Sequence, residues 1–223
     1  MNWKEQCVAI IPCWNEAGRV RRVVEGVKPL VAEALVVDDG SNDATAAEAA
    51  VAGAQVLRHP VNRGKGAALR SGFTRARELG FAWALTLDGD GQHAPEDIPA
   101  FFAAAGRTGA ELVVGNRLAA AERIPFVRRK VNQLMTARLS RLTGRSLADS
   151  QCGFRLVNLA AWSRVTLRTE RFETESELLV EFVRAGFKVE FVPVQVIYHA
   201  GGSKIHPLAD TWRWLRWWWC DRK

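Results

Sequence analysis

The sequence predicts one doubly wound α/β domain built on a mostly parallel central sheet. Its 223 residues suit a single domain, and short apolar runs alternate with helical patterns along the first half of the chain. The chain is 48% hydrophobic and 25% charged. This composition is typical of a globular protein with a sizeable core, and it excludes a disordered chain, a coiled coil or a fibre.

Five apolar runs, rich in Val, Ile and Leu, predict strands that are buried on both faces, as in a parallel sheet. They span residues 7–11, 34–37, 54–57, 83–87 and 111–114. Between the first two runs, valines recur at the spacing of a helix with one apolar stripe, at Val20, Val23, Val24 and Val27. Strands that alternate with helices in this way predict an α/β layer, whose ligands bind at the carboxyl ends of the strands.

Polar residues follow each of the five predicted strands. Any one of these segments could be an ordinary turn with a helix cap, because turns use the same residue types. Five of them at one edge of a sheet predict a binding site. The segments are Pro12-Cys13-Trp14-Asn15-Glu16, Asp38-Asp39-Gly40-Ser41, Asn62-Arg63-Gly64-Lys65-Gly66, Asp88-Gly89-Asp90-Gly91-Gln92-His93 and Gly115-Asn116-Arg117.

The fourth segment indicates a divalent metal site. Asp88 and Asp90 are separated by one residue, and flanking glycines permit the chain to turn so that both carboxylates converge. Gln92 can add a neutral oxygen. Oxygen ligands without a Cys or His cluster favour Mg²⁺ or Mn²⁺, and such ions usually also bind substrate phosphates. A solvated acidic turn is the alternative.

Two other segments favour a nucleotide. Asp38 and Asp39 end a strand, where one of them can accept hydrogen bonds from a ribose hydroxyl or a base amide. Gly64-Lys65-Gly66 lacks the spacing of a Walker motif, so we reject a P-loop. A loop that leads into a helix can still offer amide donors and the Lys65 ammonium to a phosphate.

The positive charge is concentrated in the second half of the chain. Residues 101–223 carry 20 of the 31 basic side chains and 11 of the 24 acidic ones. Over 126–142, apolar residues recur at helical spacing among basic ones, including Arg128 and Arg129. This pattern predicts a basic amphipathic helix that lies on an anionic membrane, or else a solvated surface helix. The chain lacks a nucleic-acid recognition motif, so we expect no nucleic-acid partner.

Five of the nine Trp fall within the last twelve residues. Trp is favoured at membrane interfaces, and packing of these rings onto the domain is the alternative. No apolar run approaches the roughly 18 residues that span a bilayer, and the N-terminus lacks the features of a signal peptide. We therefore expect a cytoplasmic protein with reduced cysteines, bound peripherally at the inner face of the membrane.

The motifs quoted above, in their order and spacing, resemble the family 2 glycosyltransferases. Within that family, the sequence looks most like the dolichyl-phosphate mannose synthase and polyprenyl-phosphate glycosyltransferase branch. The blocks Asp149-Ser150-Gln151-Cys152-Gly153-Phe154-Arg155 and Gly201-Gly202-Ser203-Lys204 strengthen the resemblance. It implies a Rossmann-like GT-A fold, with a catalytic domain over 1–206 and a Trp-rich amphipathic tail over 207–223.

The resemblance also implies roles for individual residues. Catalytic roles fall on Asp90, Arg117 and Lys204, metal binding on Asp88, Asp90 and Gln92, and acceptor-phosphate binding on Arg117 with Arg128 or Arg129. The nucleotide sugar would contact Pro12, Trp14, Glu16, Asp38, Asp39, Lys65, Asp88, Gly89 and Asp90. Trp14 stands where the family commonly has Tyr, and Gly89 where it has Ala. Tyr198 replaces an arginine that many members carry six residues before the Lys204 position.

The implied reaction is an inverting, metal-dependent transfer of a hexose from a nucleotide-diphosphate sugar to a polyprenyl phosphate. A lipid phosphate is already an anion, so it needs no general base. A saccharide hydroxyl acceptor would need one, and Glu173 or Glu175 could serve, although both also suit the acidic first turn of a helix. An inactive sugar-nucleotide or membrane-binding module is the alternative from another class. The sequence does not specify the sugar or the base.

Overall fold

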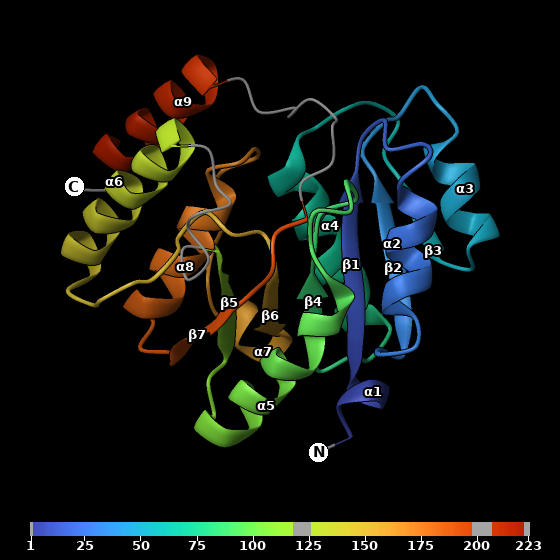
Figure 1. Ribbon diagram of the computed structural model, residues 1–223, viewed down its shortest axis with the longest axis horizontal. Helices are drawn as coiled ribbons and strands as arrows, with labels where there is room; N and C mark the ends of the chain where they lie inside the picture. The colour runs from blue at the N-terminus through green and yellow to red at the C-terminus, as the bar shows by residue number, and fades with distance from the viewer. Residues whose placement is uncertain (1, 118–125, 198–206, 221–223) are drawn as a thin grey trace.

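The computed structural model describes residues 2–117, 126–197 and 207–220 (Figure 1). Side chains are described for all of these except residues 126–128, 207–212 and 220. Over these ranges the strands form a seven-stranded sheet in the order β3-β2-β1-β4-β6-β5-β7. Its architecture confirms the predicted single-domain α/β fold with a mostly parallel sheet.

The first half of the sheet is parallel and follows the predicted apolar runs. Its strands are β1 (Cys7–Cys13), β2 (Glu33–Asp38), β3 (Gln55–Arg58) and β4 (Trp83–Thr86). The centre of β1 is fully buried because helices cover both faces of this region. In Figure 1, α2 (Val20–Val27) lies over one face and α4 (Lys65–Glu78) over the other, while α3 (Thr45–Val51) stands beside β3.

The second half of the sheet contains one reversed strand. Here β6 (Arg155–Asn158) pairs antiparallel with both β4 and β5 (Leu112–Asn116), and β7 (Val189–Pro193) pairs parallel with β5. Two reversals restore the direction, so β5 runs parallel to β4. The five polar segments therefore emerge at the same edge of the sheet, as predicted.

Neither β6 nor β7 is predicted by the apolar runs of the sequence. The first has only four residues and begins with a charged one, Arg155. The second is half-buried along most of its length, so its pattern is not the continuous apolar run of a central strand. Four further helical elements are α1 (Trp3–Gln6), the 3₁₀ turn η1 (Pro95–Asp97), α5 (Ile98–Thr108) and α7 (Leu159–Trp162).

Three helices lie together at one end of the molecule, at the left of Figure 1: α6 (Phe126–Thr143), α8 (Thr174–Arg184) and α9 (Pro207–Cys220). Leu139 of α6 and Trp214 of α9 belong to the same buried core as the sheet. None of the helices in the described ranges combines the length and apolar character that crossing a bilayer requires.

Candidate active site

The loops that follow β1 and β2 are joined by hydrogen bonds. The Asn15 amide donates to Ser41 Oγ (2.9 Å), and the Asn42 amide donates to Asn15 Oδ1 (3.0 Å). Asn15 adopts a positive φ of 53°, a conformation that Asn tolerates better than most residues. Trp14 is 42% exposed at this edge of the sheet.

The two aspartates that follow β2 hold neighbouring loops. Asp38 is fully buried, accepts the Ser41 amide (3.0 Å) and pairs with Arg58 (3.1 Å). Asp39 accepts the Arg63 amide (3.0 Å) and the Gly64 amide (2.7 Å). Both carboxylates therefore set the shape of this edge of the sheet.

His59 contacts the Asp39 carboxylate on its buried side, and no sequence motif predicts this role. Its Nδ1 lies 2.7 Å from Asp39 Oδ1 and its Nε2 lies 3.0 Å from Ser71 Oγ. Both the His59 ring and the Asp39 carboxylate are almost fully buried, so the imidazole fixes the orientation of the carboxylate. Its signal in the sequence is a single polar residue just after β3.

Lys65 connects two carboxylates that are far apart in the sequence. Its ammonium forms an ion pair with Asp88 and lies 2.5 Å from Glu175 Oε1. Burial would lower the pKa of Lys65, but the charges of Asp88 and Glu175 raise it above its ordinary value. The three side chains meet beside Gly153, where a Cβ would lie 2.6 Å from Glu175 Oε1, so a larger residue here would displace the charged ends of the cluster.

The two aspartates after β4 differ in their electrostatics. Burial would raise the pKa of Asp88, but the charge of Lys65 outweighs it and lowers this pKa to about 2. Burial and then the charge of Asp88 raise the pKa of Asp90 to about 6. Asp90 Oδ1 accepts a hydrogen bond from the backbone N–H of Gln92 (2.9 Å). Both aspartates are half-buried, and a pair of carboxylates whose charges repel one another is stabilised by a bound cation.

His93 fixes the backbone of this loop. Its Nδ1 accepts the Asp88 amide (3.2 Å), and its ring stacks on Phe154 at a centroid separation of 5.1 Å. Burial lowers the pKa of His93 to about 4, so the imidazole is neutral near pH 7 and Nδ1 remains an acceptor. In the sequence, His93 ends the motif that begins at Asp88, but the motif alone predicts no role for it.

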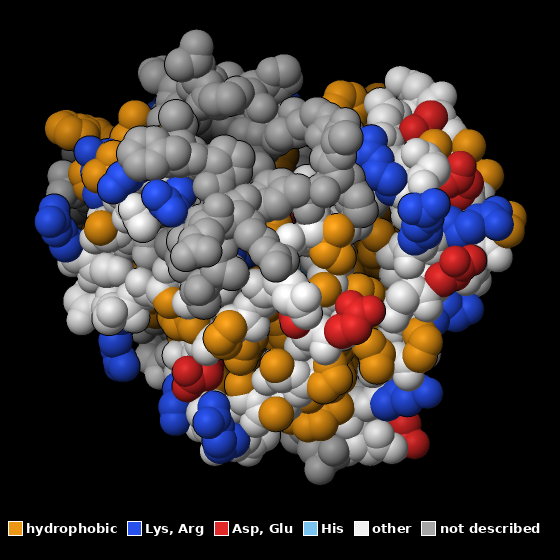
Figure 2. Space-filling model, viewed as in Figure 1, with side chains coloured by type: hydrophobic (Ala, Val, Ile, Leu, Met, Phe, Trp, Pro, Cys, Tyr) orange, Lys and Arg blue, Asp and Glu red, His pale blue; other side chains and the backbone are white. Residues whose placement is uncertain are grey.

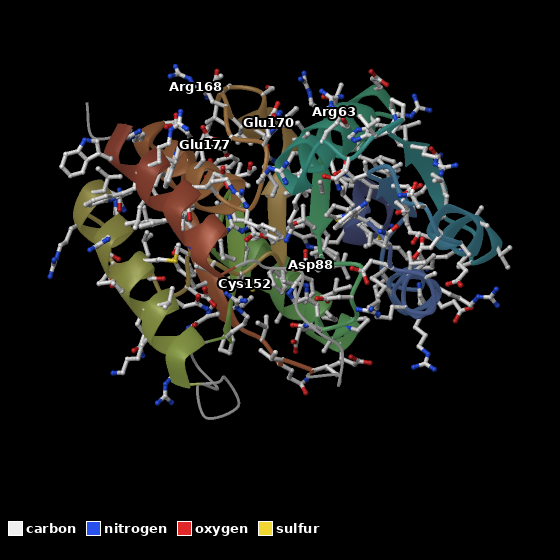
Figure 3. All side chains as sticks on the ribbon, turned by 90° about the horizontal axis from the view of Figure 1, so that it is seen from above. Arg63, Asp88, Cys152, Arg168, Glu170 and Glu177 are labelled. Carbon is white, nitrogen blue, oxygen red and sulfur yellow. The ribbon has the colours of Figure 1, made fainter. Side chains whose placement is uncertain are left out.

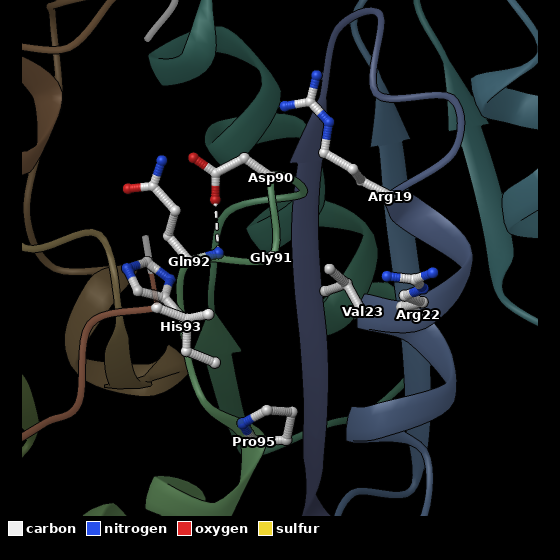
Figure 4. Close-up of a pocket in the computed structure, with 9 residues that line it drawn as sticks. Arg19, Arg22, Val23, Asp90, Gly91, Gln92, His93 and Pro95 are labelled. Atoms are coloured by element: carbon white, nitrogen blue, oxygen red, sulfur yellow. Dashed lines mark hydrogen bonds between the residues drawn. The ribbon is translucent and has the colours of Figure 1, made fainter. Parts of the chain in front are cut away.

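A cavity of about 400 Å³ opens next to Asp90. Figure 4 shows Arg19 and Arg22 on one side, from the start of α2, and the loop that bears Asp90 and Gln92 on the other. Val23, Gly91, His93, Pro95 and Ile197 complete its lining. Two guanidinium groups that line one cavity favour an anionic ligand.

Arg117 is held by a buried carboxylate. Its Nε lies 2.9 Å and its Nη2 3.1 Å from the two oxygens of Asp149, and the Arg117 amide also donates to that carboxylate (3.2 Å). The Asp149 side chain is fully buried, whereas the Arg117 side chain is 14% exposed. A bidentate pair of this kind fixes the plane of the guanidinium group.

Arg155 organises the loop between Asp149 and β6. It is almost fully buried, and its guanidinium group donates to the carbonyl oxygens of Ser150, Cys152 and Glu175. Burial lowers the pKa of Arg155 below its ordinary value. The described residues place no carboxylate in an ion pair with it, so its charge is compensated by the nearby charges of Glu175 and Asp149 together with these carbonyl dipoles.

The start of α4 is closed by a neighbouring loop. The Gly66 and Ala67 amides donate to the Glu170 carbonyl oxygen (2.8 and 3.2 Å), and Figure 3 shows Glu170 and Arg63 on adjacent loops. These two amides are thus occupied, which differs from the expectation that this helix start offers amide donors to phosphate. Lys65 remains the cationic group of the segment.

A family model for glycosyl transferase family 2 matches residues 8–165. The chain belongs to glycosyl transferase family 2. A UDP-N-acetylglucosamine–dolichyl-phosphate N-acetylglucosaminyltransferase from Methanococcus voltae is 30% identical, over 85% of this chain and 84% of that protein. An undecaprenyl-phosphate mannosyltransferase from Micrococcus luteus is 26% identical, over 93% of each chain. The resemblance to the polyprenyl-phosphate glycosyltransferases is confirmed.

The solved structures confirm the GT-A fold of this family 2 glycosyltransferase. A crystal structure of Mycobacterium tuberculosis glucosyl-3-phosphoglycerate synthase with Mn²⁺, UDP and glucosyl-3-phosphoglycerate superimposes with a TM-score of 0.76. The two sequences are 22% identical, and the match covers 98% of this chain and 80% of that one. At this identity the likeness establishes the fold alone.

The structure brings most of the predicted site residues of this glycosyltransferase to one edge of the sheet. They are Pro12, Trp14, Glu16, Asp38, Asp39, Lys65, Asp88, Gly89, Asp90, Gln92 and Arg117. Arg129 is half-buried on α6. Lys204 and Tyr198 lie outside the described residues, as does the side chain of Arg128. Their proposed roles therefore stay predictions.

Proposed function

We propose that this protein transfers a hexose, with inversion, from a nucleotide-diphosphate sugar to a polyprenyl phosphate. The observation that carries the proposal is the cluster of Lys65, Asp88 and Asp90 at the end of β4, beside a cavity rimmed by arginines. In this reaction an acceptor phosphate oxygen forms a bond to the anomeric carbon. The bond from that carbon to the nucleoside diphosphate breaks, and the diphosphate leaves with the electron pair.

The residues after β4 fit a divalent cation. Two carboxylates and the Gln92 amide group supply oxygen ligands of the kind Mg²⁺ and Mn²⁺ prefer. Among the described residues, no cluster of three or more His, Cys, Asp or Glu side chains stands ready for a metal, so the remaining ligands would come from diphosphate and water. Bound there, the ion would neutralise charge on the departing diphosphate.

Lys65 has a second carboxylate partner, which would remain if a metal ion took its place at Asp88. In this structure its ammonium pairs with both Asp88 and Glu175. If Asp88 turned towards a metal, Glu175 would keep Lys65 paired, so no buried charge would be left alone. The donor would extend from this cluster towards Trp14 and the loop held by Asp39.

The assignment of a polyprenyl phosphate as acceptor rests on the names of two relatives and on the chemistry of a phosphate nucleophile. Both relatives above are named for polyprenyl-type lipid phosphate acceptors. An anionic phosphate needs a cationic partner and no base, and Arg117 offers an oriented guanidinium group at the end of β5. Holding the phosphate in line with the anomeric carbon is then the main task of the protein.

The alternative acceptor, a saccharide hydroxyl, would need a carboxylate base. Both candidates lie at the start of α8, but Glu175 already pairs with Lys65. Glu173 has a buried carboxylate oxygen, Oε2, with no hydrogen-bond partner among the described residues. Glu173 is therefore the better candidate for this alternative.

Docking to an anionic membrane surface at the inner face of the membrane is part of the proposal. Apolar side chains are exposed on α6 at Leu134 and on α9 at Trp219, which are 54% and 67% accessible. Exposed basic residues stand on the same two helices at Lys130, Arg141 and Arg216. Figure 2 shows blue and orange side chains next to each other at this end. This mixture suits a headgroup region.

The acceptor experiment offers the purified protein several labelled nucleotide sugars with Mg²⁺ or Mn²⁺. A short polyprenyl phosphate and a panel of saccharides serve as acceptors, and products are separated into lipid and water-soluble fractions. Label in the lipid fraction supports the proposal. Transfer to saccharides only, lost in Glu173→Gln, would establish the hydroxyl-acceptor alternative.

Membrane docking is tested by liposome flotation with and without anionic lipid. We expect the double variant Leu134→Ser/Trp219→Ser to bind anionic liposomes more weakly than the wild type. Val51→Ser is the matched control, because Val51 is 71% exposed on α3 at the other end of the fold. Equal flotation of all three proteins would contradict docking through α6 and α9.

A further inference from the structure

The buried face of α9 is linked by hydrogen bonds to the segment that holds Arg117. Trp214 is 3% exposed, and its indole Nε1 donates to Ser176 Oγ of α8 (2.8 Å). The same hydroxyl accepts from Gln151 Nε2 (2.8 Å). One serine oxygen therefore joins the C-terminal helix to the segment between α6 and β6.

That segment continues to both catalytic clusters. The backbone N–H of Gln151 donates to Asp149 Oδ1 (2.9 Å), and Asp149 in turn forms the ion pair with Arg117. On the other side, Ser176 directly follows Glu175, whose carboxylate pairs with Lys65. Ser176 thus lies between the two groups that orient the positive charges of the site.

The network is also closed against α6. Gln151 Nε2 donates to Ser150 Oγ (2.9 Å), and this hydroxyl lies 3.0 Å from Thr136 Oγ1. Ser150, Ser176 and Thr136 are all buried. A buried polar network fixes one arrangement when its members are satisfied, and losing one donor leaves an acceptor without its partner.

From these contacts we infer that Trp214 is a positioning residue for the proposed transfer reaction, acting through Ser176 and Gln151 on Asp149 and Arg117. The inference rests on the proposed function. The helix that bears the Trp-rich sequence thereby completes the active site, whether or not its exposed side docks on a membrane. Trp219, 67% exposed on the same helix, has no such role.

The test compares Trp214→Phe, which keeps an aromatic ring but removes the N–H donor, with Trp219→Phe as the matched control. Transfer is measured with a short, water-soluble polyprenyl phosphate and no membrane. We expect kcat to fall about tenfold in Trp214→Phe, which corresponds to the loss of one hydrogen bond of ~1.4 kcal/mol, with the donor KM unchanged. Trp219→Phe keeps the wild-type kcat. Equal kcat values in all three proteins would overturn the inference.

A second readout does not depend on the proposed reaction. Cys152 is fully buried next to Gln151, and burial raises the pKa of its thiol to about 12, so the folded protein resists alkylation. We expect Trp214→Phe to increase labelling of Cys152, mapped by mass spectrometry, while buried Cys7 stays protected. Protection of both, or equal exposure of both, would refute a local positioning role even if the wild type transferred sugar. Selective labelling of Cys152 in Trp214→Phe, together with a wild type that transfers no sugar, would refute the proposed function alone.

Discussion

Arg117 and Asp149 form a bidentate ion pair across 32 residues of sequence, with Nε···Oδ2 at 2.9 Å and Nη2···Oδ1 at 3.1 Å. The carboxylate is fully buried, whereas the guanidinium group reaches the edge of the sheet. Asp149 therefore anchors a cation at the edge of the sheet. This relationship explains why the Asp149 block accompanies the motif that ends in Arg117.

Replacing Asp149 with Asn should loosen Arg117. The variant keeps the size of the side chain but removes the charge that fixes the guanidinium plane, and leaves a nearly buried cation without its partner. We expect transfer to fall by ~10²-fold and the melting temperature to drop. Glu181→Gln, in the more exposed pair with Arg184 (3.1 Å), is the control and should change neither. Wild-type rates in Asp149→Asn would show that Arg117 needs no anchor.

His59 should control donor affinity through Asp39. In His59→Phe the ring bulk remains, but the 2.7 Å contact with Asp39 is lost, so the loop at Gly64 becomes less ordered. We expect the donor KM to rise about tenfold with a smaller change in kcat. Ser71→Ala, which removes only the outer contact of the ring, should have a smaller effect. An unchanged KM in His59→Phe would contradict this role.

Gly153→Ala should displace the charged cluster. Its Cβ would lie 2.6 Å from Glu175 Oε1 and 2.9 Å from Lys65 Nζ, closer than these atoms can approach. We expect sugar transfer to fall at least about tenfold. Gly106→Ala in α5 is the control, because its Cβ would make only ordinary contacts. Equal activity of the two variants would show that the cluster tolerates displacement.

Gly89 and Cys13 should be coupled through their sizes. A Cβ at Gly89 would lie 2.4 Å from Cys13 Sγ, so the Ala that the family commonly has here does not fit beside this cysteine. We expect Gly89→Ala to cost ~1–3 kcal/mol of unfolding free energy in urea titrations. Adding Cys13→Ala should recover most of that loss. Additive losses in the double variant would exclude the steric explanation.

A metal ion and a nucleoside diphosphate should stabilise the protein together. With Mn²⁺ present throughout, we expect UDP at 100 times its dissociation constant for the Mn²⁺-loaded protein to add ~2.7 kcal/mol, visible as a higher melting temperature. Asp90→Asn should lose the metal-dependent part of the shift because one ligand charge is removed. The same shift in Asp90→Asn and wild type would mean that the metal binds elsewhere.

Much of the fold could be predicted from local patterns. The Val- and Ile-rich runs gave the five strands, and the residues after them gave the site edge, because strand burial and turn chemistry are local. Pairs that depend on tertiary structure could not be predicted: Lys65 meets Glu175 across 110 residues. Nor could the reversed strand β6, since nothing in four residues specifies its direction.

Contacts of the Trp-rich tail also depend on tertiary structure and could not be predicted from the sequence. Its composition suggested either a membrane anchor or rings packed on the domain, and the structure packs some of these rings on the domain and exposes another. Trp214 is buried against Ser176, Trp218 lies under the guanidinium group of Arg138 (5.1 Å), and Trp219 is exposed. Helical periodicity alone could not assign these positions, because the neighbours on α6 and α8 come from distant segments.

The central claim is that the Asp88–Asp90 loop supports metal-dependent transfer of sugar to a lipid phosphate. The most direct measurement follows label from a nucleotide sugar into a short polyprenyl phosphate, with wild type and Asp90→Asn, each with Mn²⁺ or with EDTA. We predict labelled lipid only for wild type with Mn²⁺, and at least ~10²-fold less in the other three reactions. Equal labelling by Asp90→Asn, or by wild type in EDTA, would contradict the account.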